Sequence, residues 1–69
     1  MTENVYKFIE LVGTSAVSWE DAAKKAVETA GKSLTGLRVA EIVKLDMTVE
    51  DGEVKNYRAR VSVSFKLEE

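Results

Sequence analysis

Two carboxylates, Glu41 and Asp46, lie in the stretch RVAEIVKLDM (residues 38–47), whose composition predicts a β-strand. Carboxylate oxygens ligate hard cations, and the chain has no Cys and no His, so it offers no thiolate or imidazole to a softer metal. The same absence excludes a Cys or His nucleophile or base. These residue types therefore favour an oxygen-ligated cation such as Ca²⁺, and we expect no enzymatic activity.

Glu41 stands out because of its neighbours. The residues that the two-residue period of a strand places on its face are Val39, Val43, Leu45 and Met47. Glu41 is then a metal ligand, one half of a contact with another subunit, or a charge at the edge of the core. Asp46 has the opposite parity and faces away from Glu41 unless a bulge intervenes, so we expect only one of the two to be a ligand.

Basic residues alternate along the segment that follows. Arg58, Arg60 and Lys66 share one face of a predicted strand. They could form an anion-binding or nucleotide-binding row, although such a face is more often solvated or paired across subunits. The net charge of −2 and the absence of a basic block argue against a nucleic-acid partner.

The elements that would position these side chains have clear start and stop signals. Residues 5–13 form a predicted strand that is apolar on both faces. Ser18 followed by Asp21 predicts a helix start, and we expect a helix from residue 19 to about residue 35, with Gly36 at its end. Trp19, in its first turn, is expected in the core or at an interface rather than stacked on a ligand.

A long hairpin follows the helix. We expect a strand over residues 38–50, a two-residue turn at Asp51-Gly52, and a third strand with one apolar and one polar face. The residues expected on the apolar face are Tyr57, Ala59, Val61, Val63, Phe65 and Leu67. The fold class is therefore α+β, with β-α-β-β order and one helix packed on a three-stranded antiparallel sheet in a single domain, residues 1–69.

The size of the chain suggests self-association. A domain of 69 residues buries only about 60% of the surface that its unfolded chain exposes, and no disulfide is available to compensate. The doubly apolar first strand also needs a neighbour on its second face. Because the sequence has no long apolar run and no signal-peptide pattern, we expect a cytoplasmic protein with no membrane partner.

Nearly the whole chain resembles the dodecin family. The most specific matches are ELVGTS (residues 10–15) and the V-x-V-x-F-x-L-E ending (residues 61–68). The resemblance implies a hollow homododecamer that binds flavin between subunits for storage. In flavin-binding relatives a stacking Trp stands two residues before the strand Glu and a Gln on the third strand contacts the flavin ring. Here Val39 and Arg58 occupy these positions, so flavin binding in the family's manner is not expected.

Other residues are similar to a calcium-binding branch of the family. They are Ser-Trp-Glu at residues 18–20, Val-Ala at residues 39 and 40, and Asp-Met at residues 46 and 47. This resemblance implies Ca²⁺ at subunit interfaces, with Asp46 as the first candidate ligand and Glu41 as the second. For Glu41, an intersubunit salt bridge is the favoured alternative. A flavin-storage dodecin with an altered site and an anion-binding cage remain the alternative functions.

Overall fold

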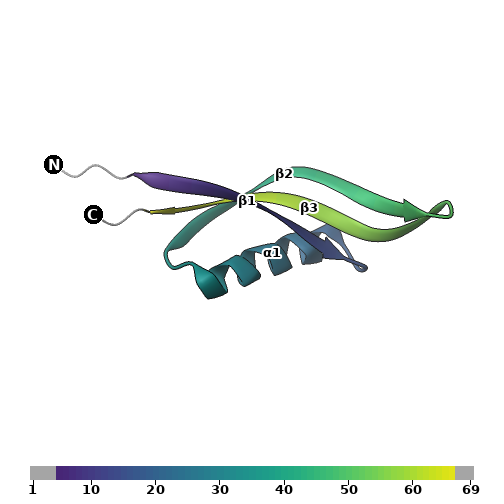
Figure 1. Cartoon of the computed structure of the whole chain (residues 1–69), viewed down its shortest axis with the longest axis horizontal. Coiled ribbons are helices and arrows are strands. Elements are labelled where there is room, and N and C mark those ends of the chain that lie inside the picture. Colours follow the sequence, from purple (N-terminus) through teal and green to yellow (C-terminus); the bar gives the residue numbers. More distant parts are fainter. Residues whose placement is uncertain (1–4, 67–69) are drawn as a thin grey trace.

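The computed structural model describes residues 5–66, which form one helix and three strands. The elements are β1 (Tyr6–Ser15), α1 (Trp19–Ser33), β2 (Leu37–Glu50) and β3 (Glu53–Lys66). The sheet order is β1-β3-β2 with both pairings antiparallel, and α1 lies along one face of the sheet (Figure 1). The predicted β-α-β-β fold is confirmed. Within the described part of the chain, no helix is long and apolar enough to cross a membrane.

The start of α1 is tied to the end of β1. The backbone N–H of Asp21 donates to the Ser18 hydroxyl at 3.0 Å, which confirms the predicted N-cap. Ser15, 3% exposed, donates to the Asp21 carboxylate at 2.7 Å and accepts from the backbone N–H groups of Val17 and Ser18. The reciprocal half of the capping box is thus relayed through Ser15. The hydrogen bond that Ser15 donates to the Asp21 carboxylate lowers the pKa of Asp21, and so does the neighbouring Lys25.

The core is thin and made of small side chains. Its buried residues are Ala22, Ala26 and Ala30 from α1, and Ala59, Val61 and Val63 from β3. The alternation predicted for the third strand is confirmed over Ala59, Val61 and Val63, because these apolar side chains are buried on the side of α1. Leu67 lies outside the described residues. The helix ends at Ser33, slightly before the expected residue 35, because Leu34 is already extended.

Two irregularities in β2 change which side chains reach which face. The pairing with β3 skips Arg38 and Val43, so that Ile42 is opposite Val61 while Lys44 is opposite Arg60. An extra residue inverts the alternation of the strand beyond it. The expectation that Glu41 shares a face with Leu45 and Met47 is therefore wrong.

The register also corrects the expectation for the two carboxylates. Glu41 is opposite Ser62, and Asp46 is opposite Arg58. Since directly paired residues of antiparallel strands point to the same side, and Ser62 and Arg58 share the face of β3 away from the core, both carboxylates lie on the face of the sheet away from α1. Glu41 therefore lies on a face that carries both polar and apolar side chains, and not among the buried residues of the core.

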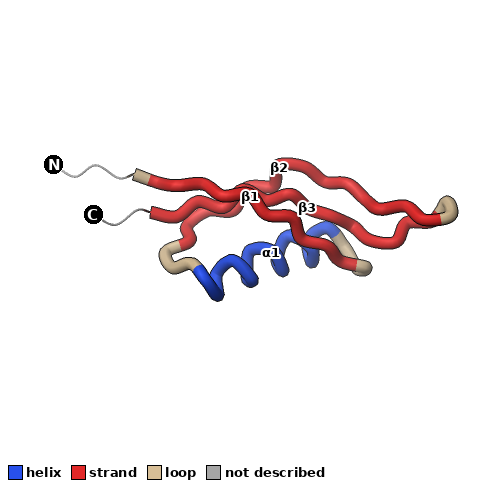
Figure 2. Tube along the Cα trace, viewed as in Figure 1, coloured by secondary structure: helices blue, strands red, loops and turns tan. Residues whose placement is uncertain are grey.

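The β2–β3 hairpin projects past the helix (Figures 1 and 2). Its turn is the predicted Asp51-Gly52 pair, and φ is +53° at Asp51 and +78° at Gly52, as a type I′ turn requires. Large apolar side chains of the hairpin remain exposed. They are Val39, Ile42, Val43, Leu45, Met47, Val49 and Val54. A single chain therefore leaves a considerable apolar surface uncovered.

Gly13 lies at a close approach of β1 to α1, and this position generates a stability prediction. A Cβ at this position would overlap the carbonyl oxygen of Ala22. We expect Gly13→Ala to lower the free energy of unfolding by about 3 kcal/mol or more, because backbone has to move to admit the methyl group. Urea denaturation at a fixed protein concentration measures this loss.

Gly31→Ala is the matched control for that experiment. Gly31 lies inside α1, and a Cβ there would meet only the Leu37 side chain at 3.8 Å. This change should stabilise the protein by about 0.5–1 kcal/mol, because Ala has the higher helix propensity. Equal effects of the two substitutions would contradict the close approach at Gly13.

Candidate functional site

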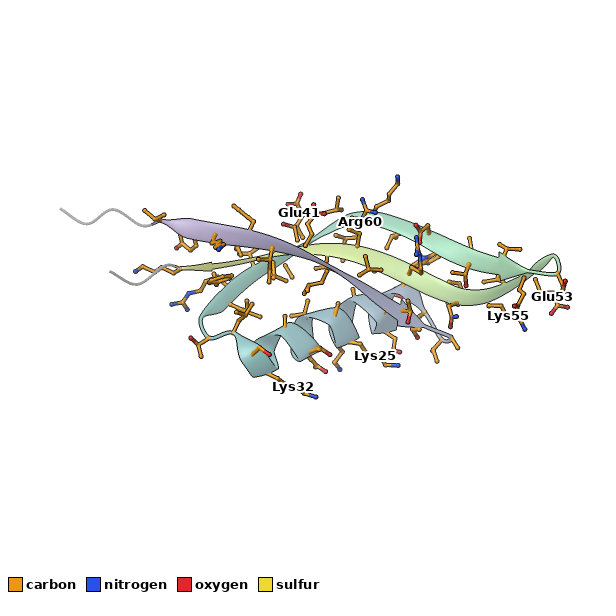
Figure 3. The ribbon with its side chains drawn as sticks, in the orientation of Figure 1. Lys25, Lys32, Glu41, Glu53, Lys55 and Arg60 are labelled. Carbon is orange, nitrogen blue, oxygen red and sulfur yellow. The ribbon has the colours of Figure 1, made fainter. Side chains whose placement is uncertain are left out.

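The face of the sheet away from α1, called the outer face below, carries the predicted site residues. Glu41 and Arg60 project on this side, whereas Lys25 and Lys32 project from the far side of α1 (Figure 3). Because β3 is the central strand, the outer face consists of rows that cross all three strands. Given in the order β1, β3, β2, successive rows are Phe8–Ser64–Val39, Glu10–Ser62–Glu41, Val12–Arg60–Lys44 and Thr14–Arg58–Asp46.

Asp46 and Arg58 form a bidentate ion pair. Arg58 Nε donates to Asp46 Oδ1 at 2.7 Å, and its Nη2 donates to Oδ2 at 2.8 Å. Each side chain is 41% exposed. The hydrogen bonds from Arg58 lower the pKa of Asp46, and the same bonds raise the pKa of Arg58. The first candidate metal ligand thus already has a cation on both of its oxygens.

Trp19 fixes the backbone of Asp46 from the other face of the sheet. Its indole N–H donates to the Asp46 carbonyl oxygen at 3.0 Å, and its ring meets Tyr57 edge-on, with centroids 5.0 Å apart and planes at 67°. Trp19 is half-buried. The sequence placed Trp19 in the core or at an interface, but its bond to Asp46 depends on a strand register that the sequence does not show.

Glu41 and Glu10 lie on opposite sides of Ser62. Both carboxylates are exposed, and within residues 5–66 neither has a basic group within 4.0 Å. Their backbones are about 10 Å apart, twice the spacing of neighbouring strands. Glu10 was not among the predicted site residues, although a carboxylate between Phe8 and Val12 on one face of a doubly apolar strand was a usable signal. Glu41 is thus available to a partner outside its own chain.

The predicted basic row is not one site. Arg58 is neutralised by Asp46, and Arg60 lies directly opposite Lys44, so that two like charges adjoin. Lys66 is six residues farther along β3 than Arg60, which corresponds to about 20 Å. Among residues 5–66, Arg60 and Lys44 are therefore the unneutralised basic residues that lie directly opposite each other on the outer face.

The two positions that match the family's flavin site are also well separated. Val39 is 62% exposed and lies opposite Ser64, which is buried between Val39 and Phe8. Arg58 lies six residues before Ser64 along β3, about 20 Å away. One subunit does not bring these positions around a single ring, and Arg58 is already bonded to Asp46.

A hard cation fits the chemistry of the donors but needs more than one subunit. Ca²⁺ takes about six to eight oxygens at 2.3–2.6 Å. In the part of the chain that the structure describes, no group of three or more acidic side chains is placed to hold a metal. The rows of Glu41 and Asp46 are about 13 Å apart, four residues of β3. Each carboxylate can therefore serve only alongside copies of itself or groups from another subunit.

The lowered pKa of Asp46 leads to a prediction of acid sensitivity. A depressed pKa in the folded state contributes stability at pH values above the unfolded value of about 3.8, and this contribution is lost as pH falls through the folded value. We expect Asp46→Asn to lower the melting temperature at pH 7. The difference in melting temperature between this variant and the wild type should shrink as pH falls below 3.8.

Arg58→Gln should give the same pattern, and the double variant should cost no more than either single change, because all three remove one interaction. Melting temperatures between pH 7 and pH 2.5 provide the measurement. Additive losses at neutral pH would show that the ion pair does not link the two residues energetically.

Known proteins resemble this chain over nearly its full length. Calcium dodecin from Mycobacterium tuberculosis is 44% identical over 64 residues, which cover 93% of this chain and 90% of that protein. Dodecin from Thermus thermophilus is 40% identical over 65 residues, 94% of each chain.

Solved structures agree. The dodecin structure from Streptomyces coelicolor covers all of this chain and 99% of its own, with a TM-score of 0.92 and 32% identity. The crystal structure of calcium dodecin from M. tuberculosis, described as calcium-chelating with a novel calcium-binding site, covers 93% of this chain and 91% of its own, with a TM-score of 0.82 and 45% identity. The family model for dodecin matches residues 5–68. The chain therefore belongs to the dodecin family.

Proposed function

We propose that this protein is a hollow homododecamer that binds a divalent hard cation, Ca²⁺ ahead of Mg²⁺, at subunit interfaces, as a binding or storage assembly rather than an enzyme. Asp46 is the first candidate ligand and Glu41 the second. The observation that carries the proposal is the skipped residue Val43, which puts both carboxylates on one face of the sheet. The 44% identity to a protein named calcium dodecin supports the choice of ion.

Self-association is supported by surfaces that one chain leaves uncovered. Tyr6, Phe8 and Val12 of β1 are each at least 45% exposed on the outer face. An apolar groove of about 590 Å³ lies between β1 and α1. Among the residues that line it are Ile9, Leu11, Ala26, Ala30 and Leu34. Packing of further copies against these surfaces would add the core that a 69-residue chain lacks.

Symmetry explains how so few acidic groups could hold an ion. Around a rotation axis, one Asp46 or one Glu41 per subunit becomes several equivalent carboxylates. Such a ring supplies the oxygens that a single chain does not bring together, and Ca²⁺ tolerates irregular geometry better than Mg²⁺ does. A salt bridge to another subunit is the alternative role for Glu41. The cytoplasmic location expected from the sequence stays a prediction.

An anion-binding cage is the second candidate function, and one observation favours it. Arg60 and Lys44 lie directly opposite each other, and within residues 5–66 neither has a carboxylate within 4.0 Å. Like charges in this arrangement destabilise a strand pair, and a bound anion would relieve the repulsion. A flavin-storage dodecin with an altered site is the remaining alternative, supported by family membership.

Calcium dependence of stability tests the proposal. We expect EDTA to lower the melting temperature and added Ca²⁺ to restore it, because a ligand that binds only the folded assembly stabilises it by mass action. Asp46→Asn should weaken this response, and Glu41→Gln should weaken it where Glu41 ligates instead. Light scattering behind a sizing column should show a dodecamer for each protein. A monomeric wild type, or melting curves indifferent to EDTA and Ca²⁺, would contradict the proposal.

Flavin binding gives a separate prediction. We expect the purified protein to be colourless and to quench riboflavin or FMN fluorescence weakly or not at all, because Val39 has no ring to stack on the flavin. Val39→Trp should restore part of the affinity, since aromatic stacking contributes about 0.5–1.5 kcal/mol for each contact. Val39→Leu is the matched control, because it adds apolar volume without an aromatic ring. Tight, saturable quenching by the wild type would favour the flavin-storage alternative.

A further inference from the structure

Two adjacent rows of the outer face carry opposite charge. The acidic row holds Glu10 and Glu41 on either side of Ser62. The basic row holds Arg60 opposite Lys44, and it lies two residues farther along β3, a distance of about 7 Å. Glu41 and Arg60 project on the same side of the sheet (Figure 3). In the part of the chain that the structure describes, none of these four charged groups has an opposite charge within 4.0 Å.

We propose that these two rows form a self-complementary contact with a second copy of the chain, in which two outer faces pack against each other around a two-fold axis. An axis that runs along the rows, midway between them, turns the second sheet over and exchanges the rows. It places Glu41 of each copy above Lys44 of the other. Arg60 of each copy then lies above Ser62 of the other, between its two carboxylates.

The shape of the outer face suits such a contact. Sheets packed face to face lie about 10 Å apart with their strands nearly aligned, and extended Glu and Lys side chains can bridge this gap. Ser62 and Ser64, at the centre of the face, are small. Apolar side chains surround the charges, because Phe8, Val12 and Val39 are 65%, 52% and 62% exposed on the same face. A second copy would cover these apolar side chains as well.

A second copy accounts for both rows at once. Like charges directly opposite each other destabilise a strand pair, so Arg60 and Lys44 need an opposite charge from outside the chain. A bound anion would neutralise only the basic row, and a bound cation only the acidic row. A second copy neutralises both rows with groups that the chain already carries. This inference rests on the self-association in the proposed function, but not on its cation.

Charge reversal in each row tests the contact, in EDTA so that no divalent cation contributes. We expect Glu41→Lys to raise the concentration below which the assembly falls to smaller species by about 100-fold or more, because the two-fold axis then brings like charges together twice. Lys44→Glu should have the same effect for the same reason. Light scattering behind a sizing column, over a dilution series, measures both changes.

A mixture of the two variants provides the decisive measurement. Lys44→Glu carries negative charge at both positions of the contact, and Glu41→Lys carries positive charge at both. When the two chains are refolded together in equal amounts, opposite charges meet again at every mixed contact, and the mixture should recover the wild-type mass. Native mass spectrometry should find both chains in one assembly. A role of Glu41 and Lys44 within their own subunit would not produce this rescue.

Glu28→Lys and Lys32→Glu are the matched controls. They change the net charge by the same amounts, but both residues are exposed on α1, and Lys32 projects from the far side of the helix (Figure 3). We expect each control to keep the wild-type mass. Circular dichroism shows whether the variants fold. If a reversed chain does not fold, Glu41→Gln and Lys44→Gln replace the reversals, and each should weaken association by about 2- to 30-fold.

The outcomes separate this inference from the proposed function. If the wild type is monomeric with and without Ca²⁺, both fail. If it assembles in EDTA and the reversed chains assemble equally well, the outer face is not the interface, although self-association stands. Loss of assembly without recovery in the mixture would also overturn the pairing of Glu41 with Lys44. Assembly of the wild type only in the presence of Ca²⁺ would support the cation and overturn this contact.

Discussion

The extra residue at Val43 is the constraint on which the outer face depends. A β-strand has only two sides, and one unpaired residue exchanges them for everything that follows. Without this bulge, Leu45 and Met47 would point away from α1 and Asp46 would point toward it. With it, Asp46 reaches Arg58 on the outer face, and Leu45 pairs with the buried Ala59 on the core side.

The small core has a parallel consequence for the rest of the molecule. Ala22 and Ala26 allow α1 to approach β1 so closely that position 13 admits only Gly. Small side chains allow close packing, but each buries little apolar area. Because burial of apolar surface contributes roughly 25 cal/mol per Å², each of them adds little stabilising free energy. The large apolar residues of the chain, Phe8 and Leu45 among them, are instead at the surface. The stability of the protein therefore depends less on the interior of the subunit than on the contacts that cover these exposed apolar side chains.

Local signals made most of the fold predictable. The Ser18 cap, the Asp51-Gly52 turn and the alternation along β3 each depend on neighbouring residues, and the structure contains all three. The bulge was not predictable, because Ile42 and Val43 are both apolar and either could face the core. The Asp46–Arg58 pair was missed for the same reason: it requires the register between two strands, which the bulge had shifted.

The pairing of Asp46 with Arg58 also bears on the symmetric assembly that we propose. A carboxylate repeated around an axis brings like charges together, and their mutual repulsion opposes association. A guanidinium bonded to each carboxylate within its own subunit cancels that charge before the subunits meet. Because the two groups sit on adjacent strands of one hairpin, the cancellation costs no additional contact between subunits. In the assembly that we propose, such a pair would allow the subunits to associate before any cation is bound, so that assembly and cation binding would be separate steps.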